Sequence, residues 1–333
     1  MDVTIGQVAK RAGVSKATVS RVINKTKPVK DETRIKVLRT IKELDFKPNP
    51  AARSLGGIKD KNLGLIVNDI SNLFVSTLVK GIEDTASVKG YNLSVSSSMG
   101  DVNKEIELLN KYSANRVDGV IFLTTALNDQ HINYLENSSM PVAMVNVYNK
   151  IEGAVNIRVD NYMAAYEMTS YFLEKGYERV GMLRTYLLDQ HSGRDRFVGY
   201  WQALASYGIA YKEELVKCGI LDSVSGYHLA GELVRDCKDI QAIFVACDLM
   251  AFGAIRALDD LGLKVPGDVE VAGFDDVPLA SYYIPSLTTV RQPITKMGGR
   301  VAECLVSRIE EGTSKCQEII LPYEIIYRES TNK

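Results

Sequence analysis

The sequence has few of the residues and runs from which metal sites, disulfides and membrane spans are built. It holds five cysteines and three histidines among 333 residues. No C-x-x-C or H-x-x-x-H spacing occurs, so we expect neither a disulfide framework nor a metal site. No apolar run approaches the roughly 20 residues that span a bilayer, and no signal-like apolar segment follows Met1. We therefore expect a cytoplasmic protein in a reducing compartment, with no membrane association.

The sequence also lacks recognisable catalytic and nucleotide-binding motifs. It contains no G-x-G-x-x-G, Walker A, G-x-S-x-G or H-E-x-x-H pattern, the spacings that position phosphates, nucleophiles or zinc. We therefore expect no enzyme activity and no cofactor. A content of 46% apolar residues is enough for one to three globular domains with sizeable cores.

The net charge of −1 is the sum of two regions of opposite sign. Residues 1–62 hold 15 lysines and arginines against 6 acidic residues, a net of +9. The remaining residues hold 25 against 35, a net of −10. Because nucleic-acid phosphates attract basic surfaces, this distribution predicts a basic, DNA-facing head on an acidic body.

Local signals predict a helix, a short turn and a second helix near the amino terminus. Thr4 and Gln7 form a capping box, and apolar residues follow at helical spacing until Gly13 supplies a left-handed stop. Ser15 is placed to cap a second helix that runs through Asn24. Its outward residues stand where a recognition helix presents base-reading side chains.

A third helix is expected from a cap at Asp31 to about Asp45, which completes a small three-helix domain. The positions expected to face inward on it are Ile35, Leu38, Ile41 and Leu44.

Residues 4–24 read T-I-G-Q-V-A-K-R-A-G-V-S-K-A-T-V-S-R-V-I-N. This run resembles the DNA-binding headpiece of the LacI/GalR family of bacterial transcription regulators. The resemblance implies major-groove contacts by Lys16, Ala17 and Arg21. It also implies phosphate contacts by Thr4, Ser15, Thr18 and Asn24. Arg21 suits a guanine edge, whereas Ala17 can only touch a thymine methyl or leave space.

The next segment, K-P-N-P-A-A-R-S-L-G-G at residues 47–57, predicts a very short helix with Asn49 as its cap. Isolated helices shorter than roughly 12 residues are marginal in water, so we expect it to order only when something packs on it. The resemblance identifies it as the family's hinge helix. Ala52 and Leu55 would then contact DNA, with Leu55 as a wedge in the minor groove.

From residue 63, short apolar runs alternate with helical stretches, which is typical of βαβ units with parallel sheets. About 270 residues are too many for one such sheet, so we expect two lobes. The runs G-F-D-D-V-P-L-A-S and P-S-L-T-T-V-R-Q-P, within residues 273–293, resemble the family's periplasmic-binding-protein-like core.

The expected fold class is therefore α+β multidomain, with a helix-turn-helix headpiece, a hinge helix and a two-lobed α/β core with parallel sheets. The expected boundaries are 1–47 for the headpiece, 48–62 for the hinge helix and linker, and 63–333 for the effector-binding and dimerisation core. Within the core, the N-lobe is expected at 63–159 and 292–321, and the C-lobe at 160–288 and 322–333.

The resemblance places a small-molecule effector between the two lobes, at strand ends and in loops. A guanidinium at Arg196 and a carboxylate at Asp275 could together hydrogen-bond vicinal hydroxyls, or the arginine alone could hold an acidic group. A structural salt bridge is the alternative for this pair. The expected effector contacts are Leu73, Phe74, Asn146, Ser192, Arg196, Leu221, Cys247 and Asp275.

Two positions depart from the family's sugar-binding members: Leu221 replaces a frequent aromatic platform, and Cys247 replaces an asparagine. Four basic residues around one loop suggest an anionic effector. A sugar, a sugar acid and a phosphorylated metabolite therefore all remain candidate effectors. These basic residues are Arg184, His191, Arg194 and Arg196. We expect Trp201 to pack in the core rather than to stack on ligand.

Together these features predict a homodimeric repressor of carbohydrate metabolism that binds palindromic double-stranded operator DNA. We expect the protein to be associated with the nucleoid when it is bound to DNA. No leucine heptads follow the last expected strand, which favours a dimer over a tetramer. The alternatives are an enzyme, a plain solute-binding receptor, and a regulator that answers mainly to a phosphorylated co-regulator protein. Thermal-shift measurements with metabolites and pull-downs with carrier proteins would separate the co-regulator alternative from control by a small molecule.

Overall fold

We describe the protein from a computed structural model, in which the chain forms two compact units, Met1–Lys61 and Asn62–Lys333. Residues 47–60, which hold most of the expected hinge segment with Ala52 and Leu55, lie outside the described residues. The described residues are 3–24, 27–46, 61–124, 127–147, 151, 153–186, 191–312 and 318–332.

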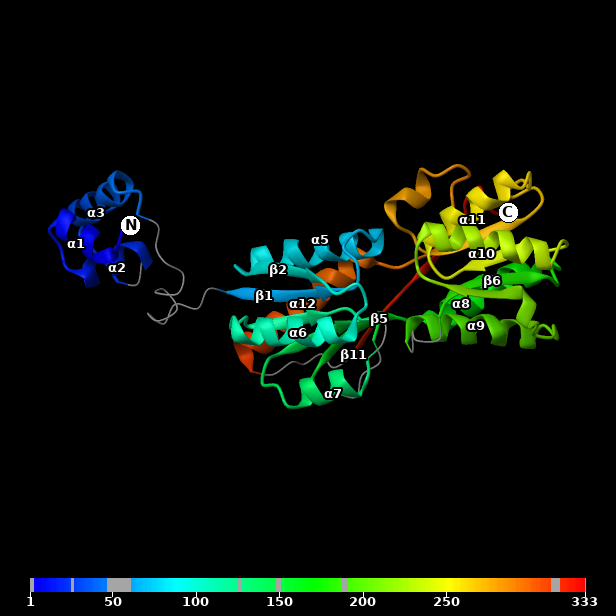
Figure 1. Ribbon diagram of the computed structural model, residues 1–333, viewed down its shortest axis with the longest axis horizontal. Coiled ribbons are helices and arrows are strands. Elements are labelled where there is room, and N and C mark those ends of the chain that lie inside the picture. The colour runs from blue at the N-terminus through cyan, green and yellow to red at the C-terminus, as the bar shows by residue number, and fades with distance from the viewer. Residues whose placement is uncertain are drawn as a thin grey trace. The chain divides into compact units, whose positions relative to one another are not determined.

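The described residues of the first unit form three helices (Figure 1). They are α1 (Ile5–Ala12), α2 (Lys16–Asn24) and α3 (Asp31–Glu43). The expected capping box is confirmed, because the Thr4 backbone N–H donates to Gln7 Oε1 at 2.7 Å and the Gln7 N–H donates to Thr4 Oγ1. Gly13 ends α1 with a φ of 62°. Ser15 Oγ accepts from the Thr18 N–H at 3.1 Å, as expected of a cap on α2.

The third helix is rotated relative to the expected inward face. Ile35 is 66% exposed and Leu38 is 47% exposed, so those two expectations are wrong. At 100° per residue, Ile35 lies roughly 200° around the helix from Val37, which is buried together with Thr40. Asp31 is the first helical residue rather than the cap. The residues of α3 and its exit that pack into the headpiece core are Val37, Ile41, Leu44 and Phe46.

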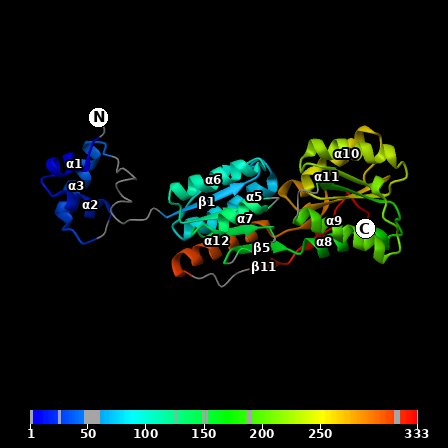
Figure 2. The same cartoon turned by 60° about the horizontal axis from the view of Figure 1, so that its bottom comes forward.

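The second unit contains two six-stranded sheets, each covered by helices on both faces (Figures 1 and 2). The first sheet is parallel throughout, in the order β11-β5-β4-β3-β1-β2. Its strands are β1 (Asn62–Val67), β2 (Asn92–Ser97), β3 (Gly119–Phe122), β4 (Val142–Val145), β5 (Val155–Val159) and β11 (Glu318–Leu321).

The helices of this first lobe are α5 (Leu73–Val88), α6 (Val102–Ala114), α7 (Asp129–Glu136) and α12 (Ile294–Glu311). Helices α5 and α12 pack on each other, and α12 also contacts the central strands. The other face of β1 is covered by α6, which packs with α7 (Figure 1).

The second sheet has the order β12-β10-β9-β8-β6-β7, and only its edge strand β12 is antiparallel to its neighbour. Its strands are β6 (Val180–Thr185), β7 (Val216–Gly219), β8 (Ala242–Val245), β9 (Glu270–Asp275), β10 (Thr288–Arg291) and β12 (Glu324–Ile326). The helices of this second lobe are α8 (Asn161–Glu174), α9 (Ser192–Ser206), η1 (Glu213–Leu215), α10 (Ser223–Asp236), α11 (Asp248–Asp260) and η2 (Pro278–Ser281).

The chain passes between the two sheets three times. It leaves the first sheet after β5 at Val159, returns after β10 at Arg291 to form α12, and crosses again between β11 and β12. Carboxyl ends of parallel strands share one edge of a sheet, and ligand sites of open α/β sheets form there. This topology therefore fixes which loops can line an interlobe site.

Glycines allow the covering helices to pack closely in pairs. A Cβ on Gly253 of α11 would lie 1.9 Å from the Ser223 carbonyl oxygen of α10, and one on Gly199 of α9 would lie 2.3 Å from the Tyr162 carbonyl of α8. Gly81 of α5 is equally tight against α12. Any side chain at these positions would push the paired helices apart.

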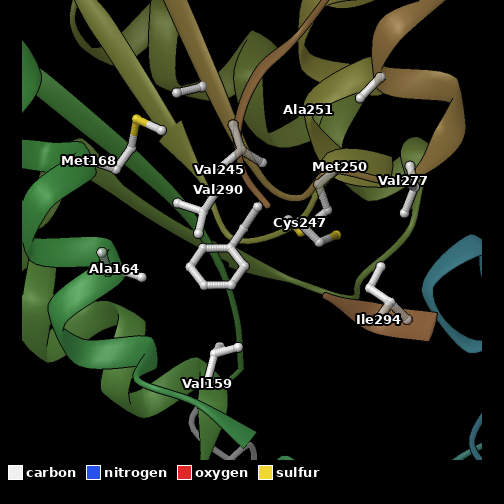
Figure 3. Close-up of a cluster of buried hydrophobic side chains, with 14 of the residues drawn as sticks. Val159, Ala164, Met168, Val245, Cys247, Met250, Ala251, Val277, Val290 and Ile294 are labelled. Atoms are coloured by element: carbon white, nitrogen blue, oxygen red, sulfur yellow. The ribbon is translucent and has the colours of Figure 1, made fainter. Parts of the chain in front are cut away.

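The largest apolar core runs through both lobes and is made mostly of aliphatic strand and helix residues. Figure 3 shows side chains from α8, β8, β10 and α11 gathered in this core, including Met168, Val245, Val290 and Met250. Cys247, which directly precedes α11, is drawn in the same cluster (Figure 3). The core thus reaches to the strand ends that carry the polar residues described next.

Candidate functional site

The exposed face of α2 carries the side chains expected to read bases. Lys16, Ala17 and Arg21 are all exposed, and Val19 and Val22 bury the opposite face in the headpiece core. Within the described residues, neither cationic group has a hydrogen-bond or ion-pair partner. Two unpaired donors on one helix face can meet base edges or phosphates without first breaking a protein contact.

The side chains expected at phosphates lie at the starts of α1 and α2 and at the end of α2. Thr4 and Ser15 cap the two helix N-termini, where backbone N–H groups and the helix dipole favour an anion. The Ser15 and Thr18 hydroxyls lie 2.9 Å apart, and Asn24 donates to Ser20 at 3.1 Å. The placement of all four is compatible with phosphate contacts.

A cavity of about 470 Å³ lies between the lobes of the second unit. Its lining includes seven of the eight expected effector contacts: Phe74, Asn146, Ser192, Arg196, Leu221, Cys247 and Asp275. Leu73 is not among the lining residues; as the first residue of α5 it packs instead against the apolar core. Adjacent side chains at the start of a helix point in different directions, and Phe74 is the one that lines the cavity.

Arg196 is held rigidly before any ligand binds. Its Nε donates to Asn161 Oδ1 at 3.0 Å, and its Nη1 donates to the Ala246 carbonyl. Its guanidinium carbon lies 3.6 Å from the centre of the Phe274 ring. The closest approach to Asp275, between Nη2 and Oδ1, is 3.9 Å, so the pair is a loose ion pair rather than a bidentate one.

Asp275 has a second partner that the sequence did not suggest. Gln292, between β10 and α12, donates from Nε2 to Asp275 Oδ1 at 2.7 Å. Burial raises the pKa of Asp275 to about 6, although Arg196 and then Gln292 favour the charged form. The carboxyl group therefore titrates within the pH range in which experiments are done.

Asp248 lies directly behind this group, as the first residue of α11. It accepts from the Val277 N–H at 2.8 Å and from the Thr289 hydroxyl, and it is fully buried. Burial, and then the charge of Asp275, raise the pKa of Asp248 well above its usual range. Sequence inspection gave no reason to select it, because its neighbours come from separate segments of the chain.

Three amide oxygens at the cavity are buried without a hydrogen-bond partner among the described residues. They are Asn68 Oδ1, Asn146 Oδ1 and Gln292 Oε1. An unsatisfied buried acceptor costs roughly 1–3 kcal/mol. Each of these oxygens requires a donor to be satisfied, and all three residues line the cavity.

The backbone at the cavity is strained at three non-glycine positions. Met99, Asn146 and Asp275 have positive φ values of 59°, 57° and 122°. Such conformations cost of order 1–3 kcal/mol each and persist only where the surroundings enforce them. Their concentration at one cavity marks it as a functional site.

The expected cluster of basic residues does not form around the cavity. Arg184 is buried, stacks 4.1 Å from the centre of the Phe197 ring, and donates to the Thr185 carbonyl. Arg194 is exposed, and His191 accepts from the Leu127 N–H at 3.3 Å. The basic residues are close in sequence but not gathered in space, because successive positions along β6 and α9 point to different sides.

Trp201 was also assigned wrongly, since its side chain is 45% exposed on α9 rather than packed in the core. The buried neighbour is Tyr200, whose hydroxyl donates to the Val180 carbonyl at 2.8 Å.

Cys247 faces the cavity and is buried, and burial raises the pKa of its thiol. The Cys247 thiol is therefore a neutral, weakly polar part of the cavity wall and not a reactive thiolate. Across the described residues, no three His, Cys, Asp or Glu side chains are grouped to hold a metal ion. The described helices include none long and apolar enough to cross a membrane.

The structure thus defines a class of protein: a helix-turn-helix domain that precedes a two-lobed α/β core with a polar interlobe cavity. Residues 4–49 match the model of the bacterial regulatory proteins of the lacI family, and residues 169–331 match a periplasmic binding protein-like domain. The chain is 34% identical to catabolite control protein A of Priestia megaterium, over 99% of this chain and 100% of that protein.

Two solved structures are similar over nearly the whole chain. The lac repressor dimer bound to operator and the anti-inducer ONPF has a TM-score of 0.88 and 28% identity, covering 99% of each chain. The transcriptional regulator CelR in complex with cellobiose has a TM-score of 0.75 and 30% identity, covering 98% of this chain and 99% of that one. The chain belongs to the LacI family and is a DNA-binding transcriptional regulator.

Proposed function

We propose that this regulator is a repressor that binds a palindromic operator as a homodimer, and that a neutral, hydroxyl-rich effector in the interlobe cavity controls its operator affinity. The observation that carries the proposal is the set of hydrogen-bond acceptors around the cavity. A sugar presents several hydroxyl donors, which match the unpartnered oxygens of Asn68, Asn146 and Gln292 and the carboxylate of Asp275.

The charge of the cavity favours a neutral ligand over a sugar acid or a phosphorylated metabolite. Among the described lining residues, Arg196 is the one basic side chain, against the carboxylates of Asp69, Asp222 and Asp275. Two nitrogens of Arg196 already donate to Asn161 and to the Ala246 carbonyl. An anion would gain little from this arginine and would be repelled by three carboxylates.

The apolar lining is consistent with a sugar ring. Phe74 of the first lobe and Leu221 of the second offer apolar surface to ring C–H groups. The similarity to the CelR–cellobiose complex supports this ligand class. Because Leu221 and Cys247 supply no aromatic platform or amide, we expect the first lobe to provide most of the apolar contact.

We propose that α2 reads the operator. Lys16, Ala17 and Arg21 would meet base edges, and Arg21 is the residue suited to a guanine. The phosphate contacts in this proposal are Thr4, Ser15, Thr18 and Asn24. Ala52 and Leu55 would contact the minor groove from the hinge segment, as the family resemblance implies.

We place the dimer contact at the exposed apolar residues of the second lobe. Tyr282 is 80% exposed and Ile284 is 88% exposed, next to the segment in which Tyr283 stacks on Phe252 at 4.7 Å. Apolar groups this exposed are typical of a surface that a second copy covers. The similarity to the lac repressor dimer supports a two-fold assembly. Sedimentation showing a stable tetramer would contradict the dimer.

The proposed function is tested by measuring operator affinity against a matched panel of ligands. Candidate operators are first selected from genomic DNA by footprinting, and binding is then titrated with glucose, cellobiose, ribose, gluconate and glucose 6-phosphate. We expect a neutral sugar to change operator affinity, and the anions to have no effect. A response to the anions alone would contradict the neutral-effector proposal. A response to none of them, together with capture of a phosphorylated carrier protein, would favour the co-regulator alternative.

A further inference from the structure

A buried carboxylate lies immediately behind the first-lobe wall of the cavity. Glu105, in the first turn of α6, is 1% exposed. Its Oε1 accepts from the Ser98 hydroxyl at 3.1 Å, and its Oε2 accepts from the Thr124 hydroxyl at 3.3 Å. Nε2 of the buried His131 lies 2.9 Å from the same Oε2. A buried charge is tolerated only where it is paired or hydrogen-bonded in this way.

The residues bound to Glu105 are directly connected to the cavity lining. Ser98 Oγ accepts from the Gly100 N–H at 3.1 Å, and Gly100 and the preceding Met99 both line the cavity. Thr124 lines it as well. One carboxylate therefore fixes two loops, which follow the carboxyl ends of β2 and β3.

The first of these loops needs external support. Met99 and Gly100 have successive positive φ values of 59° and 75°, and the Met99 N–H donates to the Asn68 carbonyl at 2.7 Å. The left-handed conformation is unfavourable for a non-glycine residue by roughly 1–2 kcal/mol. The chain Gly100 N–H to Ser98 Oγ to Glu105 Oε1 supplies part of that support.

His131 lies next to Glu105 without completing a hydrogen bond from its Nε2. Its Nδ1 accepts from the Asn128 N–H at 3.3 Å, and its Nε2 faces Glu105 Oε2. His131 is fully buried beside Phe122. The two hydroxyls that contact Glu105, those of Ser98 and Thr124, are both placed to donate to it.

We propose that Glu105 is a positioning residue for the effector cavity: it holds the Met99–Gly100 turn and Thr124 in the geometry that receives ligand. This inference rests on the proposed function, because it assigns Glu105 to the same site. Glu105 does not itself line the cavity, and acts through Ser98 and Thr124.

Glu270 provides a matched control within the same chain. It is also 1% exposed, and it accepts from Lys175 at 2.8 Å, from the Tyr177 hydroxyl at 3.0 Å and from the Asn332 N–H at 3.1 Å. It stands at the start of β9, five residues before the cavity residue Asp275, which is roughly 17 Å along a strand. Loss of a buried carboxylate at Glu270 should disturb folding but not the cavity.

The test compares Glu105→Gln with Glu270→Gln in the full-length protein. Hydrogen exchange of peptides that contain Gly100 reports on the turn without requiring a known ligand. We expect about tenfold faster exchange there in Glu105→Gln and no change in Glu270→Gln, at similar losses in unfolding temperature. Ser98→Ala removes the hydroxyl that accepts from Gly100 and that lies within donating distance of both Glu105 and the Val67 carbonyl. It should give the same local increase if Glu105→Gln fails to fold.

Titration calorimetry with cellobiose and ribose supplies the functional readout. A probe that binds the wild type should bind Glu105→Gln about tenfold more weakly and Glu270→Gln within twofold of wild type. Unchanged exchange at Gly100 in both first-lobe variants, or equal acceleration in Glu270→Gln, would overturn the assignment. If neither sugar binds the wild type, that result counts against the proposed effector class, and the exchange comparison alone decides the role of Glu105.

Discussion

The DNA-reading helix and the interlobe cavity present functional side chains in opposite ways. On α2, Lys16 and Arg21 are exposed, and within the described part of the chain they have no polar partner. In the cavity, Arg196 and Asp275 are buried and already bonded to Asn161 and Gln292. The helix can adapt to its DNA, whereas the cavity is preorganised for one ligand shape.

This difference predicts how DNA binding and effector binding each respond to the substitution of single residues. A surface of independent contacts should lose affinity residue by residue, and in proportion to the contacts removed. A connected buried network should lose function when any one member is removed, because its neighbours are left unsatisfied.

Asp275→Ala should abolish the effector response while operator binding persists. The substitution removes a charged acceptor and leaves the Gln292 amide and Arg196 without their partner. Loss of a hydrogen bond to a charged group costs about 1.5–3 kcal/mol, which is roughly tenfold to 150-fold in effector affinity. Operator binding measured with and without the active sugar provides the check. A normal response would remove Asp275 from the site.

Arg21→Ala should weaken operator binding by about 1–3 kcal/mol and relax discrimination at one base pair. The reason is that a base contact carries sequence information, whereas a phosphate contact does not. Gel-shift titrations on the operator and on random DNA measure both quantities. Thr18→Ala is the matched control, and it should weaken both DNAs together. Equal losses on operator and random DNA for Arg21→Ala would exclude its base-reading role.

Effector affinity should fall at acid pH. The pKa of Asp275 is raised to about 6, and a ligand hydroxyl donates best to the ionised form. Affinity should therefore be constant above this pKa and fall by up to tenfold per pH unit below it. Calorimetric titrations between pH 7 and pH 5 test this, with Asp275→Asn as the control that removes the dependence. An identical pH profile in that variant would assign the titration to another group.

Leu55→Ala should reduce DNA bending while the headpiece stays folded. This prediction comes from the family resemblance, since Leu55 lies outside the described residues. An apolar wedge opens a base step and kinks the duplex, and alanine is too short to do so. Circular-permutation gel mobility measures the bend. Wild-type bending in the variant would count against a wedge at this position.

The headpiece was predictable because its signals are local. The capping box at Thr4, the stop at Gly13 and the cap at Ser15 each involve residues within a few positions, and all three are present in the structure. The third helix was predicted less well, since Ile35 and Leu38 lie outside the packed face. Which side of a short helix is buried depends on its neighbours and not on its own pattern alone.

The cavity was only partly predictable, because it is assembled from distant segments. The family resemblance suggested Arg196 and Asp275, which both line it. Gln292 and Asn68 were missed: each is an ordinary amide in the sequence and acquires a role only through three-dimensional contacts. The expected basic cluster was wrong for the same reason, since Arg184 is buried against Phe197 and does not line the cavity.

We expect the cavity and the DNA-binding surface to be thermodynamically coupled through a neutral effector. The most direct test measures operator affinity at zero and saturating sugar, and sugar affinity with and without operator. Linkage requires the two affinities to change by the same factor, typically about 5-fold to 150-fold. We expect equal factors for a neutral sugar in the wild type, and little or no change in operator affinity for Asp275→Ala at the sugar concentration that just saturates the wild type. Operator affinity that no neutral sugar changes would contradict this coupling.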